Sequence, residues 1–415
     1  MSKVKPFLLV GDAVSSGTGL GRIAGMIAKG IHEDLSDVYQ VASAGHGGPG
    51  SRRFGFFQYT LEGVESSFIL PSLPQIWDDH SRGENGVIAF CWDPSRLGWL
   101  AQPDLLSELL EGLPGLRQWI KRFRENNELW IYCPVDADGP NGALTFPLKM
   151  TLLGFDRIIA YTNWGADVIR RSIGDAEAEK RHLTALPHWI DGETFYELPR
   201  QACRKAFFLR TGAQCPTGQK PEPIADDEVL IGIVATNQRR KDFPLGIQTA
   251  AILAKEMKVR LWLHTSALER DWSIPALLVD YGMVEKTVIS LGHISDDNMA
   301  VGYSASDLSL GIGSGEGFGF PLAESVFCGT PCIHGNYAGG AETLSAYPDF
   351  LVTPESFKLD GEYAFNRPTF DPETWASAAR KVLGKRTNRP SEYDWKNVWP
   401  RWREYLRKAA EGEGQ

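Results

Sequence analysis

Two glutamates, Glu316 and Glu324, stand with seven residues between them in a glycine-rich segment that reads GIGSGEGFGFPLAE over residues 311–324. Carboxylates accept hydrogen bonds from paired hydroxyls, which sugars and ribose offer. The apolar run 308–312 predicts a strand before the glycines, and Pro321 favours the first position of a helix, where its missing N–H would have no partner. We therefore expect a strand, a glycine loop and a helix that turn both carboxylates toward one pocket, with Glu316 in the loop and Glu324 in the first helical turn.

The start of this expected helix suits a phosphate group. Its unpaired N–H groups and partial positive charge favour an anion, and Gly317 and Gly319 let the backbone approach a ligand closely. The segment 311–324 resembles the E-x7-E signature of retaining GT-B glycosyltransferases, in particular family GT4. Two later segments extend the resemblance: Cys328–Pro331 (CGTP) resembles the family's turn and following strand, and Gly339–Glu342 (GGAE) resembles its GG-x-E loop.

The resemblance implies an α/β fold of the GT-B type, in which two Rossmann-like domains with parallel sheets face each other across a deep interdomain cleft. It also implies roles around a nucleotide-diphosphate-sugar: Glu316 is catalytic and lies by the donor sugar, whereas Glu324 lies by the ribose. The other donor-binding candidates in this half are Gly317, Phe318, Gly319 and Ile294, the last in a segment whose backbone would contact the base.

A basic turn, ATNQRRK at residues 235–241, follows a predicted strand and resembles the family's phosphate-binding turn. Two fixed cations beside a diphosphate would stabilise the negative charge that develops on the leaving nucleotide. Arginine forks onto phosphate oxygens, and lysine acts as a point charge. We assign this catalytic role to Lys241 and Arg240; Arg239 could exchange roles with Arg240, and the sequence leaves that choice open.

The first half carries weaker signals. Residues 15–22 (SSGTGLGR) follow a predicted strand and resemble the family's glycine-rich first loop near the donor diphosphate, which makes Gly17 and Gly19 donor-binding candidates. A dinucleotide fingerprint would need glycine where Arg22 stands, and no Gly-Lys-Ser/Thr follows for a Walker loop. A tight turn that binds no ligand is the alternative.

Acceptor-side candidates lie at or beyond predicted strand ends: His46, Asp93 and Asp136. An aspartate in such a place also serves as a helix cap or turn residue. The letters Asp136-Ala137-Asp138 are those of an Asp-x-Asp motif, but they lie in the first half, so we assign them to the acceptor side rather than to a metal site.

The resemblance implies that the acceptor hydroxyl attacks on the face that the nucleotide leaves, with the leaving phosphate helping to take the proton. We expect a hexosyltransferase that needs no metal or other cofactor and uses a UDP-, GDP- or ADP-sugar. Its acceptor would be a saccharide, a lipid-linked molecule or another hydroxyl compound. The alternatives are a nucleotide-sugar epimerase and a non-catalytic nucleotide-sugar-binding protein; a phosphorylase would need a lysine motif for pyridoxal phosphate, which we do not find.

Short apolar runs that alternate with helical patterns predict parallel sheets covered on both faces. A Pro- and Gly-rich loop, 211–227, separates the halves. The expected domains are residues 1–190, with a C-terminal helix over 392–411 packing back on them, and residues 191–391. The predicted strands are Pro6–Val10, Gly86–Phe90, Glu128–Cys133, Arg157–Tyr161, Val229–Ala235, Val259–His264, Thr287–Leu291 and Leu308–Ile312.

The C-terminal helix carries a stripe of aromatic residues that begins at Trp395, with basic residues beside it. This pattern predicts a docked helix, with contact to a membrane surface as the alternative. Pro400 should kink the helix or start a new one.

Composition bounds the function. The 415 residues carry a net charge of −9, so nucleic acid is not the expected partner, although a local basic patch is left open. Six scattered cysteines show no zinc-site spacing and indicate reduced thiols. The apolar run at the N-terminus is too short for a signal peptide, and no run spans a bilayer. We expect a cytoplasmic protein, with peripheral attachment at the inner membrane surface as the alternative.

Overall fold

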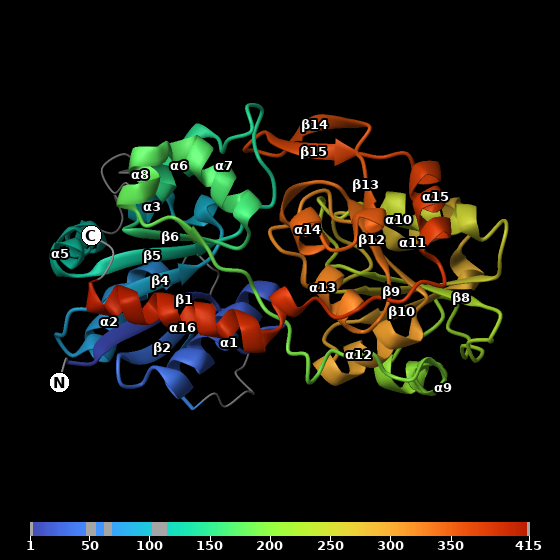
Figure 1. Ribbon diagram of the computed structural model, residues 1–415, viewed down its shortest axis with the longest axis horizontal. Helices are drawn as coiled ribbons and strands as arrows, with labels where there is room; N and C mark the ends of the chain where they lie inside the picture. The colour runs from blue at the N-terminus through green and yellow to red at the C-terminus, as the bar shows by residue number, and fades with distance from the viewer. Residues whose placement is uncertain (1–2, 47–54, 62–68, 102–113, 413–415) are drawn as a thin grey trace. The chain divides into compact units, whose positions relative to one another are not determined.

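The computed structural model describes residues 3–46, 55–61, 69–101 and 114–412 (Figure 1). The chain divides into two compact units. Unit 1 comprises Met1–His188 with Lys396–Gln415, and unit 2 comprises Trp189–Trp395. Each unit is built around its own parallel sheet.

Unit 1 contains a seven-stranded parallel sheet in the order β3-β2-β1-β4-β5-β6-β7. Its strands read as continuous apolar runs because helices cover both faces, as in β4, where all five residues of VIAFC are buried. The strands are β1 (Lys5–Asp12), β2 (Tyr39–His46), β3 (Phe57–Leu61), β4 (Val87–Cys91), β5 (Glu128–Cys133), β6 (Arg157–Ala160) and β7 (Thr184–Ala185).

The helices of unit 1 follow the strands in alternation (Figure 1). Thr18 begins the first of them, since its side chain accepts a hydrogen bond from the backbone N–H of Gly21 and so caps the helix. The helices are α1 (Gly19–Asp34), α2 (Ile69–Ser81), η2 (Pro94–Arg96), α3 (Gly98–Ala101), α5 (Pro114–Asn126), α6 (Phe146–Leu152), α7 (Asn163–Ile173) and α8 (Asp175–Lys180).

The C-terminal helix α16 (Trp395–Glu411) packs against unit 1 by its aromatic face. Trp399 Nε1 donates to Asp34 at 2.6 Å, and Trp402 Nε1 donates to the carbonyl of Pro187 at 3.1 Å. Both indoles are buried, as expected for a docked helix. Pro400 does not start a new helix, which was one of the two outcomes expected there: the helix runs from Trp395 to Glu411, with the proline inside it.

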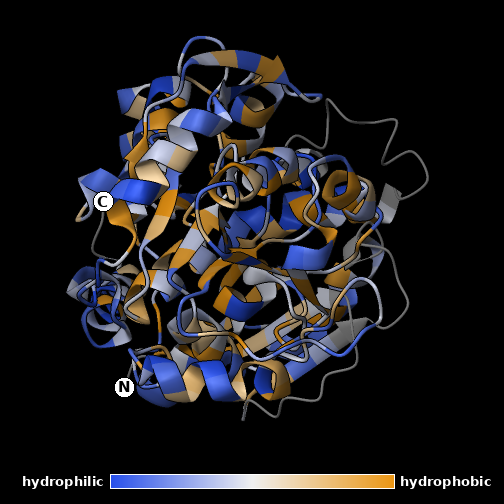
Figure 2. Ribbon diagram, turned by 90° about the vertical axis from the view of Figure 1, so that its right-hand side faces the viewer, coloured by the Kyte–Doolittle hydropathy of each residue, from blue (hydrophilic) through white to orange (hydrophobic). Residues whose placement is uncertain are grey.

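Unit 2 contains a six-stranded parallel sheet in the order β10-β9-β8-β11-β12-β13. An antiparallel hairpin, β14–β15, stands apart from it. Figure 2 shows hydrophobic and hydrophilic residues mixed along the helices of the chain. The strands are β8 (Val229–Val234), β9 (Val259–Thr265), β10 (Thr287–Leu291), β11 (Leu308–Gly311), β12 (Cys332–Gly335), β13 (Leu351–Val352), β14 (Ser356–Asp360) and β15 (Phe365–Thr369).

The helices of unit 2 alternate with these strands. They are α9 (Arg200–Thr211), α10 (Phe243–Leu253), α11 (Ile274–Asp280), η3 (Val284–Lys286), α12 (Asp296–Ala305), α13 (Phe320–Phe327), α14 (Ala338–Thr343), η4 (Pro348–Phe350), α15 (Pro372–Val382) and η5 (Ser391–Tyr393).

Both sheets have the strand order of a doubly wound fold. All strands are parallel, but the direction in which successive strands are added to the sheet reverses between two central strands. In unit 1 the reversal lies between β1 and β4, and in unit 2 it lies between β8 and β11. Ligands of such sheets bind outside the carboxyl ends of the strands at the point of reversal. The segments that follow β1 and β8 are therefore the places to look for a site.

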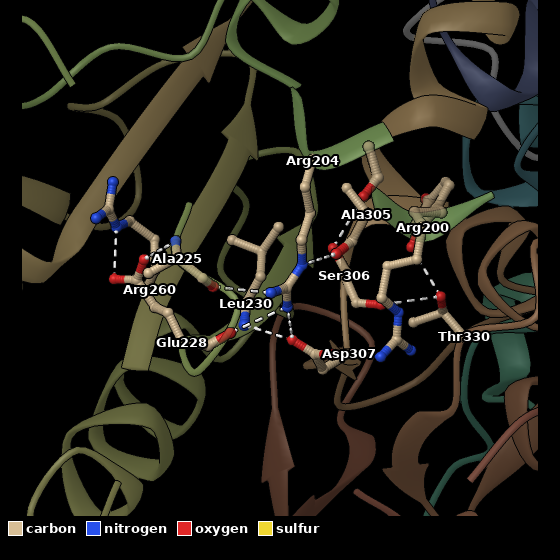
Figure 3. Close-up of polar contacts among 12 residues, drawn as sticks. Arg200, Arg204, Ala225, Glu228, Leu230, Arg260, Ala305, Ser306, Asp307 and Thr330 are labelled. Atoms are coloured by element: carbon tan, nitrogen blue, oxygen red, sulfur yellow. Dashed lines mark hydrogen bonds and ion pairs between the residues drawn. The ribbon is translucent and has the colours of Figure 1, made fainter. Parts of the chain in front are cut away.

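A buried ion-pair network joins helix α9 to the amino ends of β8 and β11 (Figure 3). The guanidinium of Arg204 contacts Asp307 and donates to the carbonyls of Ala225 and Glu228 at 2.9 and 3.0 Å. The carboxylate of Asp307 also accepts hydrogen bonds from Arg200 at 2.7 Å and from the backbone N–H of Leu230 at 2.8 Å. The network thus connects both central strands to one helix, on the sheet edge opposite their carboxyl ends.

One half-buried histidine, His264, should make unit 2 sensitive to acid. His264, near the end of β9, contacts Ser290 at 3.0 Å, and burial lowers its pKa from 6.5 to about 4. As the pH falls from 6.5 toward 4, the unfolded chain binds a proton at this histidine and the folded chain does not. The free energy of unfolding is therefore highest above pH 6.5 and decreases over this interval. We expect a loss of about 2 kcal/mol between about pH 7.5 and pH 5, measured by urea denaturation.

The variant His264→Gln tests this prediction because it cannot be protonated in that range. Its free energy of unfolding should fall by about 2 kcal/mol less than that of the wild type over the same pH interval. Equal falls in the two proteins would contradict the prediction.

Candidate active site

The basic turn and the glycine loop lie side by side at the carboxyl ends of β8 and β11. The backbone N–H of Asp242 donates to the carbonyl of Ile312 at 2.9 Å. Ser314 donates to the carbonyl of Arg240 through its backbone N–H at 2.8 Å and through its hydroxyl at 2.9 Å. The two segments meet because β8 and β11 are neighbours in the sheet and run in the same direction.

Three residues, Arg240, Lys241 and Glu316, form what we call the charge cluster. The ammonium of Lys241 contacts Glu316 Oε1, and Arg240 Nη1 lies 3.2 Å from Oε2 of the same carboxylate. Arg240 also donates to the carbonyl of Gly315 at 3.0 Å. Burial raises the pKa of Glu316, but the two cations outweigh burial and hold it at about 2, so the carboxylate is charged at neutral pH.

The charge cluster carries two positive charges and one negative charge in a buried setting, since Lys241 is 8% and Glu316 9% exposed. Fixed cations in such a place attract and stabilise a diphosphate more strongly than they would in water. A carboxylate beside them accepts hydrogen bonds from hydroxyl groups. The arrangement is thus suited to a ligand that joins a diphosphate to a sugar.

Glycines surround the cluster because side chains would not fit. A Cβ on Gly313 would lie 2.2 Å from Oε1 of Glu316, and a Cβ on Gly339 would lie 2.1 Å from the carbonyl oxygen of Gly317. A Cβ on Gly340 would lie 2.4 Å from Nε2 of His334, and the backbone N–H of Gly340 donates to the carbonyl of Glu316 at 3.1 Å. The GGAE segment therefore encloses the glycine loop from the side of α14.

The helix after the loop begins one residue earlier than we expected from the sequence. Gly319, with φ of 86°, caps α13, so Phe320 is its first residue and Pro321 its second. Glu324 consequently stands in the second turn, and the prediction that it lies in the first turn is wrong. It is 5% exposed and accepts a hydrogen bond from the hydroxyl of Tyr303 at 3.0 Å.

A small pocket opens beside the charge cluster and has about 220 Å³ of empty space, part of it open solvent. Of the predicted site residues, Lys241 and Glu316 line it, and Glu324 does not. Phe318 is buried and packs on the rings of Phe320 and Tyr393 at centroid distances of 5.6 and 5.3 Å. The lining residues are Val234, Ala235, Lys241, Gly311, Ile312, Gly313, Glu316, Pro321 and Leu322.

Ile294 lies in the loop between β10 and α12, two strands away from β8 in the same sheet. It is half-buried and follows Gly292, which has a φ of 78°. Because all the strands are parallel, this loop shares the carboxyl edge of the sheet with the charge cluster.

Sequence reasoning missed His334, which lies on β12 opposite Gly311 of β11. Its Nδ1 contacts the carbonyl of Gly311 at 2.5 Å, and its ring is close enough to Glu316 for the two to interact electrostatically. Burial lowers the pKa of His334. A histidine inside the apolar strand CIHG was the available signal.

In unit 1 the first glycine loop lies at the point where the strand order reverses. Gly17 and Gly19 are exposed on either side of Thr18, which caps α1. The sequence analysis missed Asp12, the last residue of β1, whose carboxylate accepts hydrogen bonds from Thr18 at 2.6 Å and from the indole of Trp92 at 3.2 Å. Its place at a strand end before a glycine loop was the signal.

The three acceptor-side candidates lie at or beyond the carboxyl ends of β2, β4 and β5 in unit 1. Asp93 caps the short helix η2, accepting a hydrogen bond from the backbone N–H of Ser95 at 2.8 Å, as in the alternative interpretation of this residue. Asp136 is half-buried after β5. His46 ends β2, and its side chain lies outside the described part of the structure.

Two searches of the described residues concern metals and membranes. No group of three or more His, Cys, Asp or Glu side chains lies close enough together to hold a metal ion. Within the same ranges no helix combines the length and the apolar character that crossing a membrane requires.

Solved structures with this architecture are glycosyltransferases and related proteins. Sucrose-phosphate synthase from Thermosynechococcus elongatus superimposes with a TM-score of 0.67 at 14% identity, over 98% of this chain and 99% of that one. HepE from Anabaena, in complex with UDP and glucose, gives 0.61 at 14% identity over 97% and 100% of the two chains. The chain has the GT-B fold. The fold class predicted from the sequence is therefore confirmed.

One curated protein is similar in sequence: O-antigen chain mannosyltransferase B of Escherichia coli is 24% identical over 199 residues, which are 47% of this chain. The match spans about half the length of that relative, 50%. No protein-family profile matches the sequence. The relative and the solved structures agree with the resemblance to glycosyltransferases that the E-x7-E segment carries.

Proposed function

We propose that this protein is a glycosyltransferase that moves a hexosyl group from a nucleotide-diphosphate-sugar to an acceptor hydroxyl. The observation that supports it most is the charge cluster of Arg240, Lys241 and Glu316 at the carboxyl ends of β8 and β11. The two cations would bind the diphosphate, and the carboxylate would orient the sugar hydroxyls. The HepE structures, which hold UDP, glucose or UDP-glucose on the same fold, support a nucleotide-sugar as the donor.

The proposed reaction retains the configuration at the anomeric carbon and needs no metal. The acceptor hydroxyl attacks on the face that the nucleotide leaves, and the leaving diphosphate, held by Lys241 and Arg240, takes the proton. Glu316, ionised at neutral pH because its pKa is about 2, accepts hydrogen bonds and does not act as an acid. Similarity to an O-antigen mannosyltransferase favours a saccharide or lipid-linked saccharide as acceptor.

A thermal-shift screen tests the donor. UDP, GDP, ADP and their glucose and mannose derivatives are added separately, with and without EDTA. The correct nucleotide at about a hundred times its Kd should stabilise the folded protein by about 2.7 kcal/mol, and EDTA should not change this. If none of the three nucleotides raises the melting temperature, the proposal fails.

The alternative functions give different results in the next assay. Incubation of the protein with the selected nucleotide-sugar alone should leave the sugar unchanged, whereas an epimerase would convert it. Addition of saccharide acceptors should then release the free nucleotide, and NMR of the product should show the anomeric configuration of the donor. Binding without release under any acceptor would instead favour a nucleotide-sugar-binding protein.

A further inference from the structure

The hairpin β14–β15 presents two different faces. Its register places Lys358 opposite Arg367 and Asp360 opposite Phe365, so these side chains share one face. Phe357 and Leu359 alternate with them and lie on the other face, where they are 51% and 56% exposed. The first face carries the charged residues Lys358, Asp360 and Arg367, and it contacts the basic turn and the glycine loop.

Arg367 connects this face to the glycine loop. It is 8% exposed, and its Nη1 donates to the carbonyl of Ser314 at 3.4 Å. The guanidinium also lies over the ring of Phe365, 5.4 Å from the centroid, which restricts its orientation. An arginine fixed in this way limits the positions that the carbonyl of Ser314 can take.

Asp360 connects the same face to the basic turn. Its Oδ1 lies 2.6 Å from Nη2 of Arg239, which is otherwise exposed at 75% of its side chain. Arg239 therefore points to the hairpin, whereas its neighbour Arg240 points to Glu316. The two arginines that the sequence leaves interchangeable thus have different surroundings.

These contacts form a continuous path to the charge cluster. Arg367 holds the carbonyl of Ser314, and Ser314 donates two hydrogen bonds to the carbonyl of Arg240. Arg240 and Lys241 in turn hold Glu316. A change in the hairpin would therefore be transmitted to both cations through the backbone rather than through the ligand.

We infer that hairpin β14–β15 is a brace for the proposed diphosphate site, with Arg367 and Asp360 as positioning residues. The inference rests on the proposed function for the identity of the ligand. The brace holds the basic turn and the glycine loop at the separation at which Arg240 and Lys241 bind one diphosphate. Neither positioning residue has to touch the ligand for its loss to weaken binding.

Hydrogen exchange and nucleotide binding test the brace together. The variants are Arg367→Ala, Arg367→Lys and Asp360→Asn. The matched control is Arg380→Ala, which removes an exposed arginine paired with Glu256 in the same unit. Exchange is followed by mass spectrometry in peptides that cover residues 237–242 and 312–316, and binding of UDP, GDP or ADP by calorimetry.

Arg367→Ala and Asp360→Asn should exchange faster in both peptides and should raise the Kd of the nucleotide about tenfold, which corresponds to 1.4 kcal/mol. Arg367→Lys keeps a charged donor, so it should recover most of the loss, and Arg380→Ala should match the wild type. In the transfer assay the variants should raise KM for the donor more than they lower kcat.

If Arg367→Ala and Asp360→Asn exchange like Arg380→Ala in both peptides, the hairpin is not a brace. Asp360→Asn alters an ion pair at the surface of the hairpin, so it decides the question even if Arg367→Ala fails to fold. A wild type that binds none of the three nucleotides would contradict the proposed function, while the exchange rates would still decide the inference.

Discussion

Replacement of Lys241 by alanine should lower the rate of sugar transfer by at least about a hundredfold. Lys241 is a fixed cation in a buried site, and its ammonium contacts Glu316. Without it the developing charge on the leaving diphosphate loses a stabilising partner, and Glu316 loses one of the two cations that contact its carboxylate. The measurement is kcat/KM for the donor that the thermal-shift screen identifies.

Two further variants make this result interpretable. Lys385→Ala removes a lysine that pairs with Asp349 at the surface of unit 2, and it should retain wild-type turnover. Glu316→Ala should also lose at least about a hundredfold, because one orienting group is missing. Unchanged turnover in both Lys241→Ala and Glu316→Ala, with melting temperatures showing folded proteins, would exclude the charge cluster as the site of catalysis.

The sequence predicts the two segments that form the charge cluster, because local chemistry determines their backbone paths. Glycines, a proline after them and a strand before them allow few backbone paths, and the cations of the basic turn follow the neighbouring strand. The position of Glu324 was misjudged because it depends on Gly319, whose left-handed conformation caps the helix one residue before Phe320. No residue type at that position reveals the choice between starting at Phe320 and starting at Pro321.

Residues that reach the site from a distance in sequence were harder to find. His334 lies beside Gly311 only because β12 pairs with β11, and Arg367 reaches Ser314 only because the hairpin folds back. The hairpin itself has a weak signal: β15 contains Pro368, and the turn over residues 361–364 is longer than the two-residue turn that marks short hairpins. Such contacts depend on strand order and register, which local sequence patterns do not specify.

The predicted strands correspond to β1, β4, β5, β6 and β8 to β11, which are the long apolar runs. The others were missed for physical reasons. β2 reads YQVASAGH, a mixture of small and polar residues, and β7 and β13 have two residues each. Short edge strands such as β7 and β13 bury little surface and therefore need little apolar sequence, so periodicity alone does not reveal them.

Replacement of Asp307 by alanine should lower the free energy of unfolding of unit 2 by about 3–5 kcal/mol. Its carboxylate accepts hydrogen bonds from Arg200, from Arg204 and from the backbone N–H of Leu230 (Figure 3). Arg204 is 6% exposed, so removing the carboxylate leaves a buried guanidinium with carbonyl partners alone. Urea denaturation measures the loss, and Asp349→Ala, which breaks an exposed ion pair in the same unit, should leave the midpoint unchanged.

A second replacement separates two contributions to the free energy of unfolding: the destabilisation by a buried unpaired charge and the net stabilisation by the ion pair. The double variant Arg204→Met with Asp307→Leu removes both charges and should be more stable than Asp307→Ala alone, because the buried guanidinium of Arg204 is then no longer left without its carboxylate. Since the network lies at the amino ends of β8 and β11, and the charge cluster lies at their carboxyl ends, folded Asp307→Ala should still bind nucleotide with the wild-type Kd. A denaturation midpoint for Asp307→Ala equal to that of Asp349→Ala would show that the network contributes little to stability.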